Sequence, residues 1–151
     1  MNPIVPTHLV DLVVVIIANL TNLLLAVMFL FRARGRSRLG NGFGWGAVLL
    51  GIPLLAAIVL NALSGRPWWT LVLPGLLVLY DLVEFGLDHV FKFDFRQSRW
   101  LGPYLALYYL ALMGMIGYSF AAGRTFGFIT LGTYFINLAA TAYSFSRVRH
   151  G

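Results

Sequence analysis

The chain of 151 residues contains no cysteine, and its content of charged residues is low. The absence of cysteine excludes disulfides, thiolate metal sites and cysteine redox chemistry. Charged residues make up 11% of the chain and hydrophobic residues 60%, with a mean hydropathy of +0.82, whereas a soluble domain carries about 25% charged residues. A soluble fold of this length cannot bury so much apolar surface. We therefore predict an all-α integral membrane protein, because a β-barrel would show short alternating segments.

Five apolar stretches have the length that a membrane-spanning helix needs, which is about 20 residues. The predicted spans are roughly 9–31, 43–63, 68–91, 101–122 and 125–145. Short connections rich in turn residues join them, and no repeat or long linker divides the chain. Residues 1–151 are therefore expected to form one transmembrane domain, a bundle of five helices.

The basic residues predict the orientation of this bundle. Nine of the eleven Lys and Arg residues follow the first, third and fifth spans: Arg32, Arg34, Arg36, Arg38, Lys92, Arg96, Arg99, Arg147 and Arg149. Arg66 and Arg124 fall on the other side. The positive-inside rule then places the N-terminus outside and the C-terminus in the cytoplasm, and we expect the cytoplasmic (inner) membrane of a prokaryote. The net charge of +6 is explained by this topology, so no nucleic-acid partner is expected.

Acidic residues inside the third span are the main functional signal. Asp81, Glu84 and Asp88 share one helix face, and no Lys or Arg shares that span before Lys92. Acids within a membrane are costly and point to function. Asp88 has a simpler explanation, since it precedes Lys92 by four residues and can pair with it. Asp81 and Glu84 are expected either to hold a proton, to share a bound cation or to face a wet cavity.

Other polar residues lie at the same predicted depth as these acids. Asn19 and Asn22 in the first span, Tyr108 in the fourth and Asn137 in the fifth fall near the middle of their spans. Lipid excludes polar faces, so they should turn inward, and we predict that the four side chains form one cluster with Asp81 and Glu84. Asn and Thr residues in membrane helices also serve as plain interhelical hydrogen-bonding groups. The second span offers Asn61 alone and is expected to be a packing helix.

The leading hypothesis is a small transport or ligand-binding protein. Asp81 and Glu84 would bind a proton or small cation near the bilayer midplane, with the four cluster residues as hydrogen-bonding partners. The chain is expected to act as a homo-oligomer or, in the main alternative, as a structural or accessory subunit of a larger membrane complex. Whether a bound cation is a metal ion is not decided by the sequence.

A lipid-modifying membrane enzyme is the third hypothesis, with Asp88 and His89 as secondary candidates at the cytoplasmic end of the third span. The acidic spacing superficially resembles the motifs with which membrane prenyl- and phosphoalcohol-transferases hold magnesium and a diphosphate. Such chemistry needs a second acidic cluster on another span, and Asp11 is the one acid that lies within another predicted span. The histidines, His8, His89 and His150, share no depth, so we expect neither a haem nor another cofactor.

Overall fold

The structure, a computed structural model, describes residues 6–87 and 99–148. This part of the chain is helical apart from short connections, and it contains no strand. The helices are α1 (Thr7–Ala33), α2 (Ser37–Leu49), α3 (Gly51–Leu63), α4 (Trp69–Phe85), α5 (Leu101–Ala122) and α6 (Arg124–Val148). The predicted all-helical fold is confirmed.

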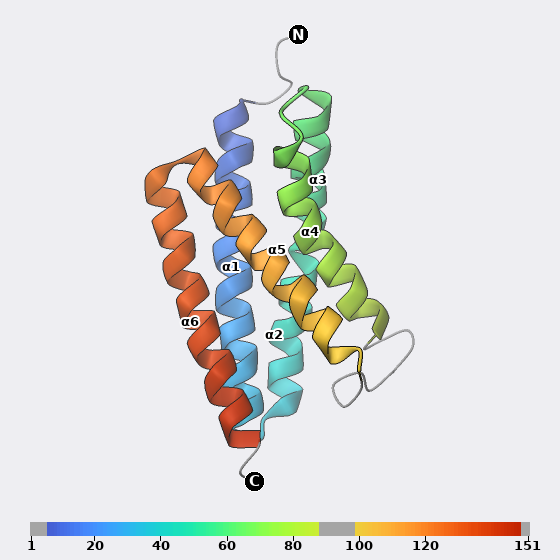
Figure 1. The fold of residues 1–151 in the computed structure, drawn as a ribbon, viewed down its shortest axis with the longest axis vertical. Coiled ribbons are helices and arrows are strands. Elements are labelled where there is room, and N and C mark those ends of the chain that lie inside the picture. The colour runs from blue at the N-terminus through green and yellow to red at the C-terminus, as the bar shows by residue number, and fades with distance from the viewer. Residues whose placement is uncertain (1–5, 88–98, 149–151) are drawn as a thin grey trace.

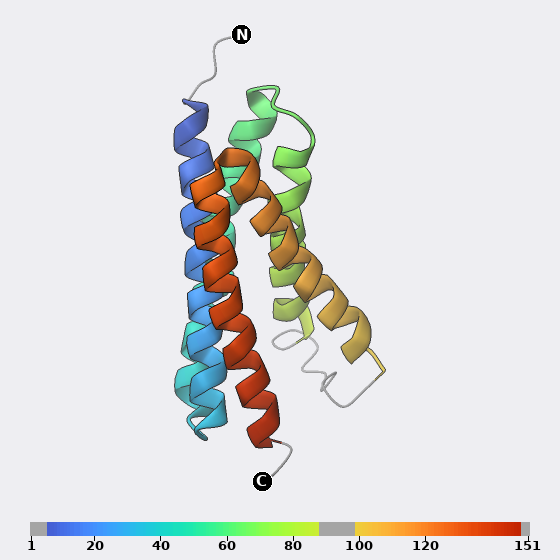
Figure 2. The same ribbon diagram turned by 60° about the vertical axis from the view of Figure 1, so that its left-hand side comes forward.

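The helices run up and down in one bundle (Figure 1). We call the end that carries the N-terminus the upper end, as drawn there, and the opposite end the lower end. Helix α1 descends, α2 and α3 return together to the upper end, α4 descends, α5 rises and α6 descends to the C-terminus. Helix α5 is tilted, so that it meets α6 at the upper end while its lower end lies away from α6, on the side of α4 (Figure 2).

Four helices within the described residues are long and apolar enough to cross a membrane, judged by length and composition. They are Thr7–Ala33, Ser37–Leu63, Leu101–Ala122 and Arg124–Arg147, and α2 and α3 together form the second of these. The third predicted span, 68–91, corresponds to α4, which has 17 residues. Its last residues, 88–91, lie outside the described part, and the candidates Asp88 and His89 lie there with them.

The second span differs from the prediction in two respects. It begins at Ser37 instead of near residue 43, and it is interrupted at Leu50 between α2 and α3. Pro53 causes this break, because it has no N–H to donate to the Leu49 carbonyl four residues earlier. The Leu50 N–H bonds to the Ala47 carbonyl at 3.1 Å, which is a tighter turn than an α-helix makes. The second span is therefore a broken helix.

The loop from α3 to α4 begins with a glycine turn that fixes the position of Arg66. Gly65 has a φ of 62°, a conformation that residues with a Cβ rarely adopt. The N–H of Gly65 bonds to the Ala62 carbonyl, and the N–H of Arg66 bonds to the Asn61 carbonyl at 3.1 Å. This pair of bonds is a Schellman motif, which ends the helix and satisfies its last carbonyls. It places Arg66 directly after the end of α3.

Polar side chains are buried in the bundle and large apolar side chains cover its outside. Asn22, Asn61, Thr130 and Asn137 are each at most 2% exposed, while Ile52, Leu82 and Trp68 are 66%, 63% and 71% exposed. A soluble monomer shows the reverse preference. Glycines permit the closest helix contacts. A Cβ on Gly114 of α5, for example, would lie 3.2 Å from the Leu73 carbonyl oxygen of α4.

Candidate functional site

An ion pair between Asp11 of α1 and Arg66 joins the helices at the upper end. The Arg66 guanidinium donates to both carboxylate oxygens of Asp11, at 2.6 and 3.2 Å. The two side chains are 18% and 15% exposed, so the pair is largely shielded from solvent. The bond to Asp11 raises the pKa of Arg66 above its ordinary value, against the opposing effect of burial. A bidentate ion pair of this kind fixes the relative orientation of the two side chains in addition to neutralising their charges.

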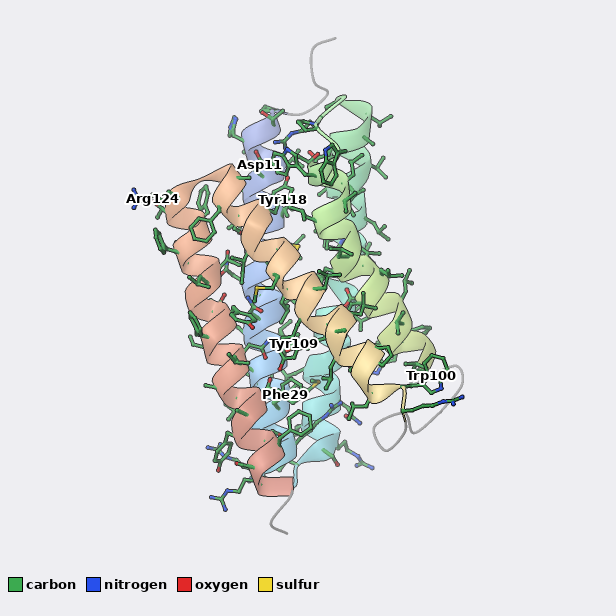
Figure 3. The ribbon with its side chains drawn as sticks, in the orientation of Figure 1. Asp11, Phe29, Trp100, Tyr109, Tyr118 and Arg124 are labelled. Atoms are coloured by element: carbon green, nitrogen blue, oxygen red, sulfur yellow. The ribbon has the colours of Figure 1, made fainter. Side chains whose placement is uncertain are left out.

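The ion pair continues into a network that reaches four helices. Arg66 also donates to the Asn61 side-chain oxygen at 3.0 Å, and the Tyr118 hydroxyl of α5 donates to Asp11 at 2.7 Å. Figure 3 shows Asp11 and Tyr118 close together at the upper end. The Asn61 amide donates to the Thr70 carbonyl of α4 at 3.2 Å. Pro74 leaves this carbonyl without its helical donor, so Asn61 replaces the bond that the proline removes.

The sequence-based prediction missed this network. It described Asn61 as the single polar residue of a packing helix and used Arg66 only to count charges. A signal was present, because Asp11 and Arg66 are an acid and a base assigned to the same end of the bundle. An unpaired charge in apolar surroundings is costly, so an acid and a base at the same depth are expected to form an ion pair.

The predicted candidates Asn19 and Asn22 lie at the contact between α1 and α6. The Asn22 amide donates to the Thr133 hydroxyl at 3.1 Å, and Thr133 donates to the Asn19 side-chain oxygen at 2.8 Å. The Asn19 amide then donates to the Thr130 hydroxyl at 3.0 Å. Thr130 donates to Ser119 of α5 at 2.9 Å. Side chains of three helices thus form one directed chain of hydrogen bonds, which holds α1, α5 and α6 together.

Two buried oxygens beside this chain have no hydrogen-bond partner among the described residues: the hydroxyl oxygen of Thr21 and the side-chain oxygen of Asn22. Their residues are 1% and 2% exposed. A buried polar atom without a partner costs about 1–3 kcal/mol. Around the hydrogen-bond chain at α1, two polar atoms are therefore buried without a partner from the described residues.

Tyr108 and Asn137 are brought together as predicted. The Asn137 amide donates to the Tyr108 hydroxyl at 2.7 Å, across the contact between α5 and α6. Thr141 donates to the Asn137 backbone carbonyl at 2.8 Å. Tyr108 and Asn137 are 4% and 1% exposed. This pair forms a second polar contact between these helices, nearer the lower end than Thr133.

Asp81 of α4 is 6% exposed and faces α3. A Cβ on Gly51 would lie 3.2 Å from its carboxylate oxygen Oδ2, so the acid stands against the first residue after the break in the second span. Within the described part of the chain, the Asp81 carboxylate makes no hydrogen bond or ion pair. It interacts electrostatically with Glu84, one turn further along α4.

Glu84 connects Asp81 to a group of tyrosines between α4 and α5. The Glu84 carboxylate acts electrostatically on Tyr80, and the Tyr80 hydroxyl lies 2.9 Å from the Tyr104 hydroxyl. The Tyr80 ring packs against the rings of Tyr104 and Tyr108, with centroids 5.6 and 5.3 Å apart. The ring of Tyr109 packs against that of Tyr108 at 5.1 Å.

The predicted single cluster is instead divided. Asn19 and Asn22 bond to α6, Tyr108 pairs with Asn137, and Asp81 with Glu84 faces α3 and the tyrosines. In the described residues no hydrogen bond joins Asp81 to any of the four predicted polar partners. The correction has a simple reason: each amide on α1 and α6 finds a partner on the helix directly beside it. The described residues also contain no group of three His, Cys, Asp or Glu side chains placed to hold a metal ion.

Comparison with known proteins gives no matching family, no matching curated protein and no matching solved structure. The function is therefore inferred from the residues of this chain.

Removing one charge of the upper ion pair should destabilise the protein strongly. In Asp11→Asn the Arg66 cation loses its counter-ion in a shielded position, so unfolding free energy should fall by about 3 kcal/mol. Tyr118→Phe removes one hydrogen bond and should cost about 1 kcal/mol. Denaturation in detergent measures both. The double variant Asp11→Asn/Arg66→Met should lose less than the sum of its single variants, and strict additivity would show that the two side chains do not interact.

The hydrogen-bond chain between α1 and α6 makes a paired prediction with two threonines. Thr133→Val removes the partners of Asn19 and Asn22 and should cost about 1 kcal/mol, at about 0.6 kcal/mol for each interhelical bond. Thr21→Val makes the same chemical change at a buried hydroxyl that has no partner in the described part of the chain, so stability should stay equal or rise. Thermal unfolding of both variants in one detergent measures the difference. Equal losses in the two would contradict the bonding pattern.

Proposed function

We propose that the chain is a small membrane protein of the transport or ligand-binding type, which holds a proton or small cation at Asp81 and Glu84. The residues that carry this proposal are Asp81, whose carboxylate is buried, and Glu84, which lies one turn further along α4. The network at the upper end and the bonded chain between α1 and α6 then serve as the scaffold around this site.

The membrane environment is supported by the surface and by the charges. Large apolar side chains cover the outside of the bundle, and polar groups are inside. The lower end carries most of the described basic residues: Arg32, Arg34, Arg36, Arg38, Arg99 and Arg147. Arg124 lies at the upper end (Figure 3), and so does Arg66, which is bonded there to Asp11. By the positive-inside rule the lower end is cytoplasmic, and the inner membrane of a prokaryote is the proposed location.

The observation that carries the proposal is the state of Asp81. A carboxylate at 6% exposure that makes no hydrogen bond or ion pair with the described residues is unfavourable as a bare anion. A proton or a cation removes this cost. Asn19, Asn22 and Asn137 give no such relief, because their side chains bond elsewhere.

The second observation is the broken helix beside the acid. Asp81 lies against Gly51, directly after the interruption at Leu50. Pro53 leaves the Leu49 carbonyl without its helical donor. Interrupted membrane helices that expose backbone carbonyls beside a buried acid are a recurring way to coordinate a proton or a small cation. Asp81 and the break therefore form one site.

This proposal predicts that stability depends on the ligand of Asp81. Raising the pH should lower the melting temperature of the wild type in detergent, because deprotonation leaves a buried and unpaired negative charge. A cation that binds should reverse the loss, and at one hundred times its Kd it should add about 2.7 kcal/mol. Thermal unfolding is scanned over pH with Na⁺, K⁺, Mg²⁺ and Ca²⁺ as probes. In Asp81→Asn both responses should disappear.

Asp11→Asn is the matched control, since it changes an acid of the same type at the upper end. It should lower the melting temperature throughout while the response to high pH and to cations persists. A wild type that responds to neither pH nor cations would contradict the proposal. It would favour the alternative of an accessory subunit, in which Asp81 forms an ion pair with a basic residue of a partner protein.

A further inference from the structure

We propose that Asp81 binds a small monovalent cation, and that Thr21 and Asn22 of α1 are its other side-chain ligands. This inference rests on the proposed function and deepens it, because it names the class of ligand and two further residues that hold it. The juxtaposition that carries it is a buried carboxylate on α4 and two buried, unbonded oxygens on α1, which meet at Gly51.

The packing of α1 against the second span places Thr21 opposite Gly51. Lower in the bundle, a Cβ on Gly44 of α2 would lie 3.0 Å from the sulfur of Met28 on α1. Residues seven apart share a helix face, and α1 descends while α2 and α3 rise beside it (Figure 1). Two turns nearer the upper end, the corresponding residues are Thr21 on α1 and Gly51 at the start of α3. Thr21 therefore lies on the face of α1 that is directed at the helix break.

Asp81 reaches the same glycine from α4. A Cβ on Gly51 would lie 3.2 Å from the carboxylate oxygen Oδ2 of Asp81. The bond from the Asn61 amide to the Thr70 carbonyl aligns α3 with α4 at the upper end, and both Gly51 and Asp81 lie about three turns below it. Because Gly51 has no side chain, no side-chain atom of this residue separates the oxygens of α1 from the carboxylate of α4.

The two oxygens on α1 have the properties of vacant ligands. The hydroxyl oxygen of Thr21 and the side-chain oxygen of Asn22 are buried without a hydrogen-bond partner among the described residues, and their residues are 1% and 2% exposed. The nitrogen of the Asn22 amide donates to Thr133 at 3.1 Å, so this bond holds the side chain and leaves its oxygen free. Hydroxyl, amide and carboxylate oxygens are the ligands that hard cations prefer.

A cation satisfies this set of oxygens better than a proton does. A proton on Asp81 provides one O–H donor, which can serve only one of the two oxygens on α1. A cation can be coordinated by all three side chains at once. It is also favoured by the negative potential of Glu84, which acts electrostatically on Asp81 from one turn further along α4.

The charge of the ligand set favours a monovalent ion. Asp81 brings one negative charge, and Thr21 and Asn22 bring none, so a monovalent cation makes the site neutral. Divalent ions are usually held by more than one carboxylate. The described part of the chain contains no group of three His, Cys, Asp or Glu side chains placed for a metal ion.

The test measures Na⁺ binding through the melting temperature of the purified protein in detergent. The Na⁺ concentration is varied at constant pH, and choline chloride keeps the ionic strength constant, so that a general salt effect cancels. The wild type should show a saturable rise. Thr21→Val keeps the shape of the side chain but removes the ligand oxygen, so the apparent Kd for Na⁺ should increase at least tenfold. Thr21→Ser keeps the hydroxyl and should bind Na⁺ nearly as the wild type does.

Thr141→Val is the matched control. Thr141 is a buried threonine of α6, 4% exposed, whose hydroxyl donates to the Asn137 backbone carbonyl at 2.8 Å. The variant makes the same chemical change outside the proposed site, so its apparent Kd for Na⁺ should match that of the wild type.

The possible failures separate this inference from the proposed function. A wild-type affinity in Thr21→Val, or an equal loss of affinity in Thr21→Val and Thr21→Ser, would overturn the role of the Thr21 hydroxyl and leave the proposed function standing. A response to pH that requires Asp81, without any response to Na⁺ or K⁺, would show that the ligand is a proton and overturn the cation site. If the wild type responds neither to pH nor to any cation, the proposed function fails as well.

Discussion

Polar groups inside this bundle depend on partners from neighbouring helices, and this constraint shapes the arrangement of the helices. Large apolar side chains cover the outside, so water does not compensate a polar side chain that faces the interior. The constraint operates even at the level of single backbone atoms. Pro74 removes the donor of the Thr70 carbonyl in α4, and the amide of Asn61 from α3 supplies another at 3.2 Å. The same amide side chain accepts from Arg66, and Arg66 binds Asp11.

The two ends of the bundle satisfy this constraint differently. At the upper end charges neutralise each other, and the network extends from α1 through the α3–α4 loop to α5. Lower down, neutral amides and hydroxyls connect α6 to α1 and α5. The contact between α4 and the lower part of α5 consists of tyrosines instead, with hydroxyls paired at 2.9 Å. Asp81 is the charged exception, because its carboxylate is buried beside the helix break without a bonded partner in the described residues.

The sequence predicted the helical class, the order of the helices along the chain and the inward direction of polar side chains such as Asn137 of the last predicted span. These features follow from composition and from the helical period, which are local properties. The break at Leu50 was missed although Pro53 marks it, because a continuous apolar stretch outweighed a single proline. The partners of Asn19 and Asn22 on α6 were also missed. Asn19 and Asn137 share a depth, but depth along a span does not tell which neighbouring helix a side chain meets. That depends on the tilt of α5 and on close contacts such as Gly114 against Leu73.

The predicted site residues make different kinds of contact in the structure. Asn19 and Asn22 have become part of the bonded contact with α6, and Tyr108 with Asn137 forms a separate pair. Asp81 and Glu84 remain two acids about one turn apart on the same helix, and the structure adds Tyr80 and Tyr104 as neighbours. Tyr80 was not among the predicted candidates. Its signal was its spacing, since it precedes Glu84 by four residues and therefore shares its helix face.

The central claim is that the buried acid at position 81 takes up a proton or cation in the folded protein. An infrared titration of the protonated carboxyl band, recorded for the wild type and for Asp81→Asn in the same detergent, tests it most directly. The account predicts a band that grows as the pH is lowered and that is missing from the variant over the same range. Identical spectra for the two proteins across the titration would contradict it.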